Sequence, residues 1–120
     1  HFDGSSWALI DTGSPTAITA VWASGPSDVW ALGKEPGRVL RFDGAAWTAI
    51  ETSIPAIASR IAGTGADDVF IISSAGVARF DGERWSPVRT IPARTYEDVV
   101  VDGAGGVYFI GQGYEALLRD

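Results

Sequence analysis

The stretch Arg41-Phe42-Asp43-Gly44-Ala45-Ala46-Trp47 decides the fold, because it occurs three times in this sequence. The other copies are His1-Phe2-Asp3-Gly4-Ser5-Ser6-Trp7 and Arg79-Phe80-Asp81-Gly82-Glu83-Arg84-Trp85. An Asp-Gly pair between two apolar runs is a strong signal for a hairpin, because a two-residue type I′ turn needs positive φ at both central residues. Each copy therefore predicts the end of one strand, a tight turn, and a tryptophan that begins the next strand and packs against a neighbouring sheet.

The copies are evenly spaced, which indicates a tandem repeat. The motif begins at residues 1, 41 and 79, and Leu118-Arg119 occupies the place of Leu40-Arg41. A second block aligns at residues 21–33, 61–73 and 99–111. Self-similarity at a fixed period of this length is the signature of a repeat architecture. We therefore divide residues 1–120 into three repeats, 1–40, 41–78 and 79–118, with one unit split between the two ends of the sequence.

We expect each repeat to form four short strands. The segments are rich in β-branched and aromatic residues and are bounded by Gly, Pro, Asp and Ser. The first strands are expected at residues 17–21, 57–61 and 98–101, and the second at 28–32, 68–72 and 106–110. The third are expected at 38–42, 76–80 and 116–119, and the fourth at 7–10, 47–50 and 85–88. No segment has helical spacing over three turns, so we expect almost no helix.

Four-stranded units of about 40 residues in tandem are typical of β-propeller blades. The runs at residues 69–72 and 107–110 are apolar throughout, as expected for sheets that are covered on both faces. A two-sheet sandwich predicts apolar and polar residues in alternation and gives no reason for the period. The fold class we expect is therefore all-β, a β-propeller built from three four-stranded antiparallel blades.

Three blades cannot close a ring, since known propellers usually have four to eight. The segment at residues 7–10 is expected to complete a sheet that the C-terminal strands begin. The missing blades have two possible sources, a second copy in a head-to-tail dimer of six blades or the flanking blades of a longer chain. We favour the dimer slightly over the longer chain.

The composition excludes several classes of partner and chemistry. The net charge is −6 and the basic residues are scattered singly, so we expect neither nucleic acid nor a membrane surface as a partner. The sequence has no cysteine, which excludes thiol catalysis and thiolate metal sites. No apolar stretch approaches the ~20 residues of a membrane span. The absence of methionine fits a processed product or an excised piece.

Residues 21–33 and 41–47 resemble the blades of a family of bacterial extracytoplasmic β-propeller repeats, abundant in myxobacteria-like genomes. These blades follow the pattern Val-Trp-Gly-Ser-Gly-Pro-x-Asp-Val-Trp-Ala-Val-Gly and, later, Asp-Gly-x-x-Trp. The other repeats match less well, with Ala62 and Val100 where the first has Trp22. The turn is also similar to the Asp-box of sialidase-like propellers, but is one residue shorter. The resemblance implies a propeller in a secreted, cell-surface or periplasmic protein, and no shared enzyme activity.

Three aromatic residues break the repeat and are candidates for ligand binding: Trp22, Tyr96 and Tyr114. Beside a loop, such a ring can stack on a sugar, although plain packing explains it equally well. The aromatic residues that recur at equivalent positions are expected in the packing between blades: Trp7, Trp47 and Trp85 at one position, and Trp30, Phe70 and Tyr108 at another.

The sequence contains no set of residues that identifies a reaction. Asp3, Asp43 and Asp81 lie in turns, where Asp stabilises its own backbone. No calcium-binding loop surrounds Asp28 or residues 67–68, so we expect no metal and no cofactor. The function that we predict is a non-catalytic, lectin-like binding module that recognises a glycan or a protein surface through blade-edge loops or inter-blade pockets. The alternatives are a structural spacer or, with less support, an enzyme of the sialidase or lyase type, which would need clustered Arg or paired carboxylates.

Overall fold

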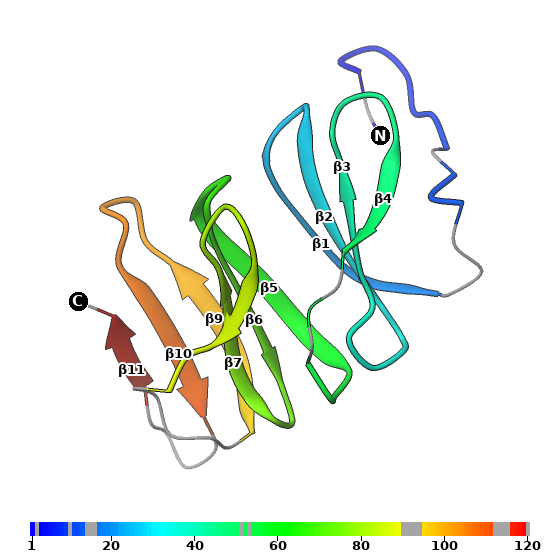
Figure 1. The fold of residues 1–120 in the computed structure, drawn as a ribbon. Coiled ribbons are helices and arrows are strands. Elements are labelled where there is room, and N and C mark those ends of the chain that lie inside the picture. The colour runs from blue at the N-terminus through cyan, green and yellow to red at the C-terminus, as the bar shows by residue number, and fades with distance from the viewer. Residues whose placement is uncertain are drawn as a thin grey trace.

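The computed structural model describes residues 1, 3–9, 11–13, 17–50, 52, 54–89, 95–111 and 116–119, the last four as backbone only. These residues form eleven strands and no helix (Figure 1). The described part of the chain accordingly has no helix that could cross a membrane.

The strands form three antiparallel sheets in which chain neighbours are also neighbours in space. Blade 1 consists of β1 (Ile18–Gly25), β2 (Asp28–Gly33), β3 (Val39–Phe42) and β4 (Trp47–Ile50). Blade 2 consists of β5 (Ala58–Gly65), β6 (Asp68–Ser73), β7 (Gly76–Phe80) and β8 (Trp85–Pro87). Blade 3 consists of β9 (Tyr96–Val101), β10 (Val107–Gly111) and β11 (Ala116–Arg119). The all-β fold and the four-stranded pattern of the repeat are thus confirmed.

The expected strand at residues 7–10 is not formed in the described part of the chain. Residues 7–9 lie outside the three sheets, and residue 10 lies outside the described residues. The Ala8 N–H donates to the His1 carbonyl over 2.8 Å, and the terminal amine of His1 donates to the Ala8 carbonyl over 2.9 Å. The first copy of the motif therefore forms its hairpin, but no neighbouring strand extends this hairpin into a sheet.

The register of blade 3 differs by one residue from the sequence alignment. Tyr108 lies opposite Leu118, whereas Trp30 lies opposite Arg41 and Phe70 lies opposite Arg79. The backbone position of Arg41 in blade 1 is therefore occupied by Leu118 rather than by Arg119.

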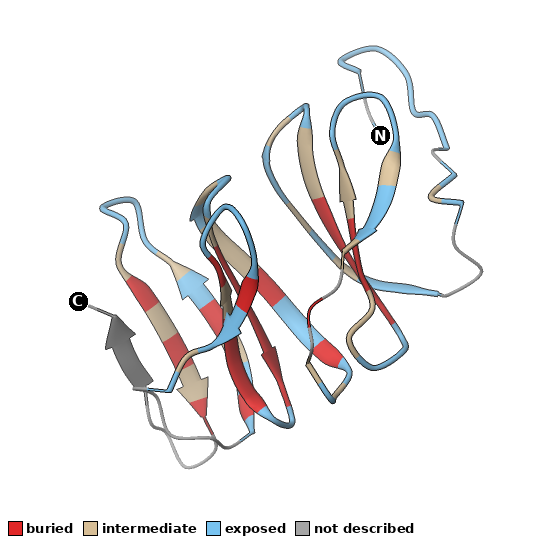
Figure 2. Cartoon of the chain, in the orientation of Figure 1, coloured by how far each residue is buried: buried red, intermediate tan, exposed pale blue. Residues whose placement is uncertain are grey.

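The core lies between the blades. We call the face of a blade that points to the preceding blade its front face, and the opposite face its back face. One buried cluster joins the back of blade 1 to the front of blade 2: Trp30, Leu32, Val39, Ala58, Ile61, Val69, Ile71, Ala78, Phe80 and Trp85. A second joins blades 2 and 3: Phe70, Ile72, Val77, Tyr96, Val99, Val107 and Phe109. Buried residues consequently concentrate in the central blade (Figure 2).

The recurring aromatic residues pack between blades where a neighbouring blade is present. The ring of Trp30 lies 4.9 Å from the ring of Phe80 and 5.5 Å from that of Trp85, both in edge-on contacts. Phe70 meets Phe109 in the same way at 5.5 Å. At the ends of the stack, Trp47 and Tyr108 are only half-buried and Trp7 is 80% exposed. The predicted packing is confirmed inside the stack, while Trp7 does not contribute to the core.

The turns lie at two opposite ends of the blades (Figure 1). The Asp-Gly end carries the turns that join the first to the second and the third to the fourth strands. The crossover end carries the β2–β3 and β6–β7 turns and the segments that lead from one blade to the next. Gly44, at the Asp-Gly end, has φ of +98°, and an added Cβ would lie 2.9 Å from the hydroxyl oxygen of Ser27. Two turns of one blade therefore touch at a position that requires glycine.

Candidate functional site

The repeated aspartates serve the turns. The Asp43 N–H donates to the Ala46 carbonyl, so Gly44 and Ala45 are the central residues, one position later than the Asp-Gly pair suggests. Glycine at the first central position is the pattern of a type II′ turn. Asp43 Oδ1 accepts the N–H groups of Ala46 and Ala45 over 2.9 and 2.8 Å, and these bonds lower the pKa of Asp43. Its carboxylate is therefore committed to the backbone of its own turn.

The other copies repeat this arrangement. Backbone N–H groups of Ser6 and Ser5 lower the pKa of Asp3 to about 2, and those of Arg84 and Glu83 lower the pKa of Asp81. In the β9–β10 turn, Asp102 accepts the N–H groups of Gly106 and Ala104, which lower its pKa as well. Hydrogen bonds to the ionised form explain each shift. None of these groups has the raised pKa that a general acid near neutral pH would need.

Two arginines at the Asp-Gly end form repeated ion pairs. Arg41 Nε lies 2.7 Å from Asp28 Oδ1, and Arg79 Nε lies 2.6 Å from Asp68 Oδ1. The Arg41 guanidinium also lies 4.6 Å from the ring of Trp30 and 5.4 Å from that of Phe80, so it bridges blades 1 and 2. Among the described residues, no three His, Asp or Glu side chains come together where a metal ion could bind.

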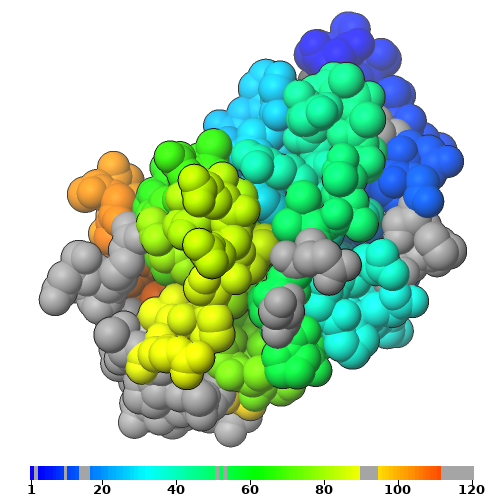
Figure 3. All heavy atoms as spheres, viewed as in Figure 1, coloured from blue at the N-terminus to red at the C-terminus, as the bar shows by residue number. Residues whose placement is uncertain are grey.

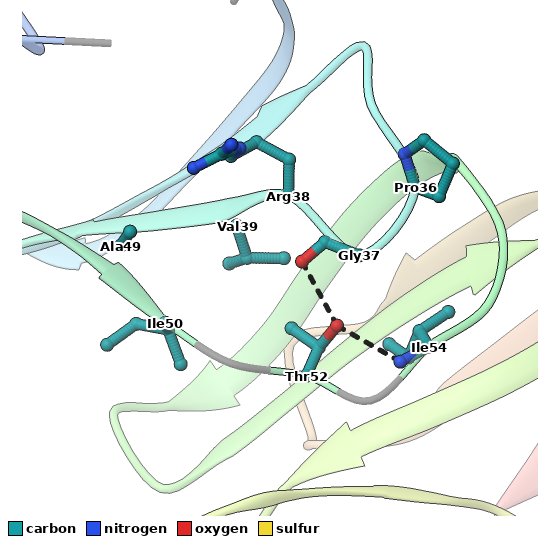
Figure 4. A pocket seen from close by; sticks show the side chains of 8 residues that line it. All are labelled: Pro36, Gly37, Arg38, Val39, Ala49, Ile50, Thr52 and Ile54. Atoms are coloured by element: carbon teal, nitrogen blue, oxygen red, sulfur yellow. Dashed lines mark hydrogen bonds between the residues drawn. The ribbon is translucent and has the colours of Figure 1, made fainter.

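A cleft opens at the crossover end between blades 1 and 2. Its first pocket, of about 230 Å³, is shown in Figure 4. It is lined by the β2–β3 turn, by the end of β4 and by the segment that leads from β4 to β5, which we call the crossover. The lining residues are Pro36, Gly37, Arg38, Val39, Ala49, Ile50, Thr52 and Ile54. The accessible lining is more polar than apolar. Arg38, paired with Glu35 over 3.1 Å, lies at the exposed side.

The crossover is fixed by hydrogen bonds to the β2–β3 turn. The Thr52 hydroxyl donates to the Gly37 carbonyl over 3.1 Å and accepts the N–H of Ile54 over 3.2 Å (Figure 4). The Gly37 N–H donates to the Ala56 carbonyl over 3.1 Å. Gly37 has φ of +67°, and a Cβ there would lie 3.0 Å from the Ile54 carbonyl oxygen. A side chain at position 37 would therefore push the crossover away from blade 1.

A second pocket, of about 300 Å³, lies on the other side of the same crossover. It is lined by the β6–β7 turn, β8 and the crossover: Thr52, Ile54, Pro55, Ser73, Ala75, Gly76, Val77, Ala78, Trp85 and Pro87. Thr52 and Ile54 border both pockets, so together the pockets form one divided inter-blade cleft. Trp85 contributes a buried indole N–H with no acceptor among the described residues, as is also the case for Trp30 and Trp47.

Of the predicted site residues, Trp22 takes part in packing between blades. It is half-buried on the back of blade 1 and contacts the first buried cluster. A Cβ added to Gly63 would lie 2.8 Å from Trp22 Cη2 and 2.7 Å from the Asp68 carbonyl oxygen. Gly63 therefore leaves room for the indole ring between the blades.

Tyr96 takes part in packing, which is one of the two roles that the sequence allows for it. Tyr96 is 2% exposed, belongs to the second buried cluster and lies edge-on to Phe109 at 6.2 Å. It pairs with Gly111 just as Ile18 pairs with Gly33 and Ala58 with Ser73, which makes it a front-face residue of the repeat. An aromatic side chain fills this core position because blade 2 covers it. Tyr114 lies outside the described residues.

The stack of blades is similar to a known β-propeller. It matches a solved structure of YCF48 bound to D1 peptide with a TM-score of 0.62 and 18% sequence identity. The match covers 95% of this chain and 40% of the YCF48 chain. No protein-family profile matches the chain, and no curated protein sequence matches it either. The fold is therefore that of a partial β-propeller, and the chain spans two fifths of the length of this neighbour.

The sequence analysis named inter-blade pockets but missed the residues that form them. Ile54 and Thr52 lie in a crossover with no repeated motif, and their neighbours in the cleft come from turns far apart in the chain. The one available signal was Gly37, a residue type that permits the positive φ of a tight turn and the close approach of another segment.

Proposed function

We propose that this chain is a non-catalytic binding module whose inter-blade cleft takes an extended segment of a protein. The observation that carries the proposal is the divided cleft, in which pockets of about 230 and 300 Å³ flank Thr52 and Ile54. Small-molecule sites usually occupy ~300–1,000 Å³. Each pocket thus suits one or two side chains rather than a complete ligand. Two adjoining pockets of this size favour a peptide that places different side chains on the two sides of the crossover.

The lining of the cleft supports a peptide over a sugar. In the second pocket, Ile54, Pro55 and Pro87 leave apolar surface accessible, which amino acid side chains use better than sugar hydroxyls do. A sugar site usually offers an exposed aromatic platform, but Tyr96 is buried and Trp22 is packed against blade 2. The similar propeller YCF48 was solved bound to D1 peptide, an example of a peptide ligand on this fold.

The test is selection of peptides from a random display library on the 120-residue chain, followed by titration of an enriched peptide. Ala75→Trp and Pro36→Trp place large side chains beside the two pockets at positions that are exposed. We expect each to weaken binding at least about tenfold, which corresponds to ~1.4 kcal/mol. Ala45→Trp is the matched control, because Ala45 is exposed at the opposite end of the blade.

Two results would overturn the proposal. The first is that no peptide is enriched. The second is that enriched peptides bind Ala75→Trp and Pro36→Trp as tightly as the wild type. A glycan array run in parallel separates the remaining possibilities: binding that Trp22→Ala abolishes would establish a sugar ligand, and binding to neither library leaves the spacer role.

We also propose that further blades complete the ring and that a second copy supplies them for this chain. Two chains of three blades give six, which lies within the usual range of four to eight. A head-to-tail pair would also cover the exposed outer faces of the end blades.

A further inference from the structure

The front face of blade 1 is an apolar sheet face that no blade covers in the described chain. It forms one side of a hollow of about 810 Å³, whose other side is formed by the N-terminal segment. Figure 3 shows this segment beside blade 1. The lining residues of blade 1 include Ile18, Val21, Val29, Ala31, Phe42 and Trp47. Val21 is 61% exposed. Exposed apolar side chains that gather on one face of a sheet leave a surface that a partner can cover.

The equivalent face of blade 2 shows what such a surface binds. Val21 pairs with Ala31 as Ile61 pairs with Ile71, yet Ile61 is only 9% exposed. Phe80 and Trp85, the counterparts of Phe42 and Trp47, are buried under Trp30 of the preceding blade. The front face of blade 1 therefore has the same aromatic pair but lacks the ring that covers it.

The back face of blade 3 carries a matching ring. Tyr108 lies opposite Val100 in the sheet, just as Trp30 lies opposite Trp22. Trp30 is fully buried, whereas Tyr108 and Ile110 are half-buried and Val100 is 44% exposed. The Tyr108 hydroxyl donates to Asp102 Oδ2 over 3.2 Å, so its polar end already has a partner. The two ends of the stack are therefore the two halves of one blade–blade interface.

We propose that the front face of blade 1 is a socket for Tyr108 and Ile110 of a second copy of this chain. The Tyr108 ring lies against Phe42 and Trp47, as Trp30 lies against Phe80 and Trp85 within one chain. Its hydroxyl remains with Asp102 at the rim of the contact. This inference deepens the proposed completion of the ring and rests on it, because two identical contacts of this kind join two chains head to tail.

The faces themselves argue for another blade of this repeat rather than an unrelated partner. The front face of blade 1 is apolar, and among the described residues that line the hollow only His1 is ionisable. The back face of blade 3 presents Val100, Tyr108 and Ile110, with Asp98 opposite Ile110 in the sheet. Inside one chain the same pair of faces meets twice, between blades 1 and 2 and between blades 2 and 3. The back face of one blade therefore packs against the front face of the next at both junctions within the chain.

Sedimentation equilibrium over a series of concentrations tests the socket. We expect the wild type to reach twice the chain mass of 12.6 kDa, and Val21→Asp and Val100→Asp each to lower it to one chain mass. An added carboxylate would be buried without a partner in the contact. Ile57→Asp is the matched control, since Ile57 is 46% exposed but does not line the hollow. Circular dichroism and tryptophan fluorescence establish that each variant is folded.

Mixing the two variants sharpens the test. In a mixed dimer of Val21→Asp with Val100→Asp, one contact carries both substitutions and the other carries none. In a dimer of either variant alone, each of the two contacts carries one substitution. We therefore expect the mixture to associate more than either variant alone. A wild type that remains at one chain mass would overturn both the socket and completion by a second copy. A wild-type dimer that neither variant weakens would overturn the socket alone and leave self-association through another surface.

Discussion

Blade 2 and blade 1 are built from the same repeat but differ in how far their strands are buried. In β6, Val69, Phe70, Ile71 and Ile72 are all buried, two on each face. In β2, Trp30 and Leu32 are buried on the back face, while on the front face Ala31 is buried but Val29 is only half-buried. The large side chains of a blade are thus more completely buried on a face that a neighbouring blade covers. The contribution of a repeated residue to stability should follow the same rule.

The largest contrast is expected between Trp30 and Tyr108, which occupy one repeat position. Trp30→Ala should cost ~3–5 kcal/mol of unfolding free energy, because a large buried ring leaves a cavity. Tyr108→Ala should cost about 1 kcal/mol or less while the chain is monomeric, because the ring is half-exposed. Urea unfolding at low protein concentration measures both. Equal costs would show that the position, and not the neighbouring blade, determines the contribution.

The next contrast concerns two glycines of one strand. Gly63→Ala should destabilise by ~1–3 kcal/mol, because its Cβ would meet both the Trp22 ring and the Asp68 carbonyl. Gly65→Ala, two residues further along β5, has nothing within 4 Å of its Cβ and serves as the control. Thermal unfolding of the two variants provides the measurement. Unchanged stability in Gly63→Ala would show that Trp22 is not packed closely against Gly63 of blade 2.

A smaller difference is expected between the two ion-paired arginines. Both pairs are partly exposed and should contribute only ~0–1 kcal/mol each. Arg41 also lies over the rings of Trp30 and Phe80, so Arg41→Gln should cost ~0.5–1 kcal/mol more than Arg79→Gln. Chemical denaturation at low salt resolves this difference. A larger cost for Arg79→Gln would contradict the bridging role of Arg41.

The smallest effect is expected from the turn aspartates, which are alike in both blades. The pKa of Asp81 is lowered in the folded chain, so its contribution is present above the ordinary value of about 4 and is lost as the pH falls below it. The midpoint of thermal unfolding should therefore fall on acidification from about pH 5 to about pH 2. Asp81→Asn keeps an acceptor for the turn but does not titrate, and should reduce this fall slightly. If the unfolding midpoint of Asp81→Asn fell with pH as steeply as that of the wild type, Asp81 would not stabilise its turn in the ionised form.

Much of the fold could be predicted from the sequence, because the same turn and strand signals occur in each repeat. The apolar runs and the Asp-Gly-x-x-Trp motif located the strands of blades 1 and 2 to within a few residues. The motif at residues 1–7 repeats the same signals, but it forms a hairpin without a sheet. A strand needs a neighbour to pair with, and pattern alone does not supply one.

The side chains were harder to predict than the strands. Tyr96 looked like an exception to the repeat, yet it lies in register with Ile18 and Ala58 and is buried by blade 2. Trp22 was a candidate because it breaks the repeat, whereas its environment depends on Gly63, 41 positions further along the sequence in the next blade. The cleft is likewise formed by turns and a crossover that share no motif. Contacts between blades depend on pairs of residues from different repeats, which the period does not specify.

Amide hydrogen exchange on the monomeric chain tests the central claim most directly, namely that these repeats stack as blades and that only blade 2 is covered on both faces. The account predicts the slowest exchange in β6 and β7, with faster exchange in β3, β4 and β9, because opening of the end blades exposes less core. Equal protection of β3 and β6, or faster exchange in β6 than in the strands of blade 1, would contradict this account.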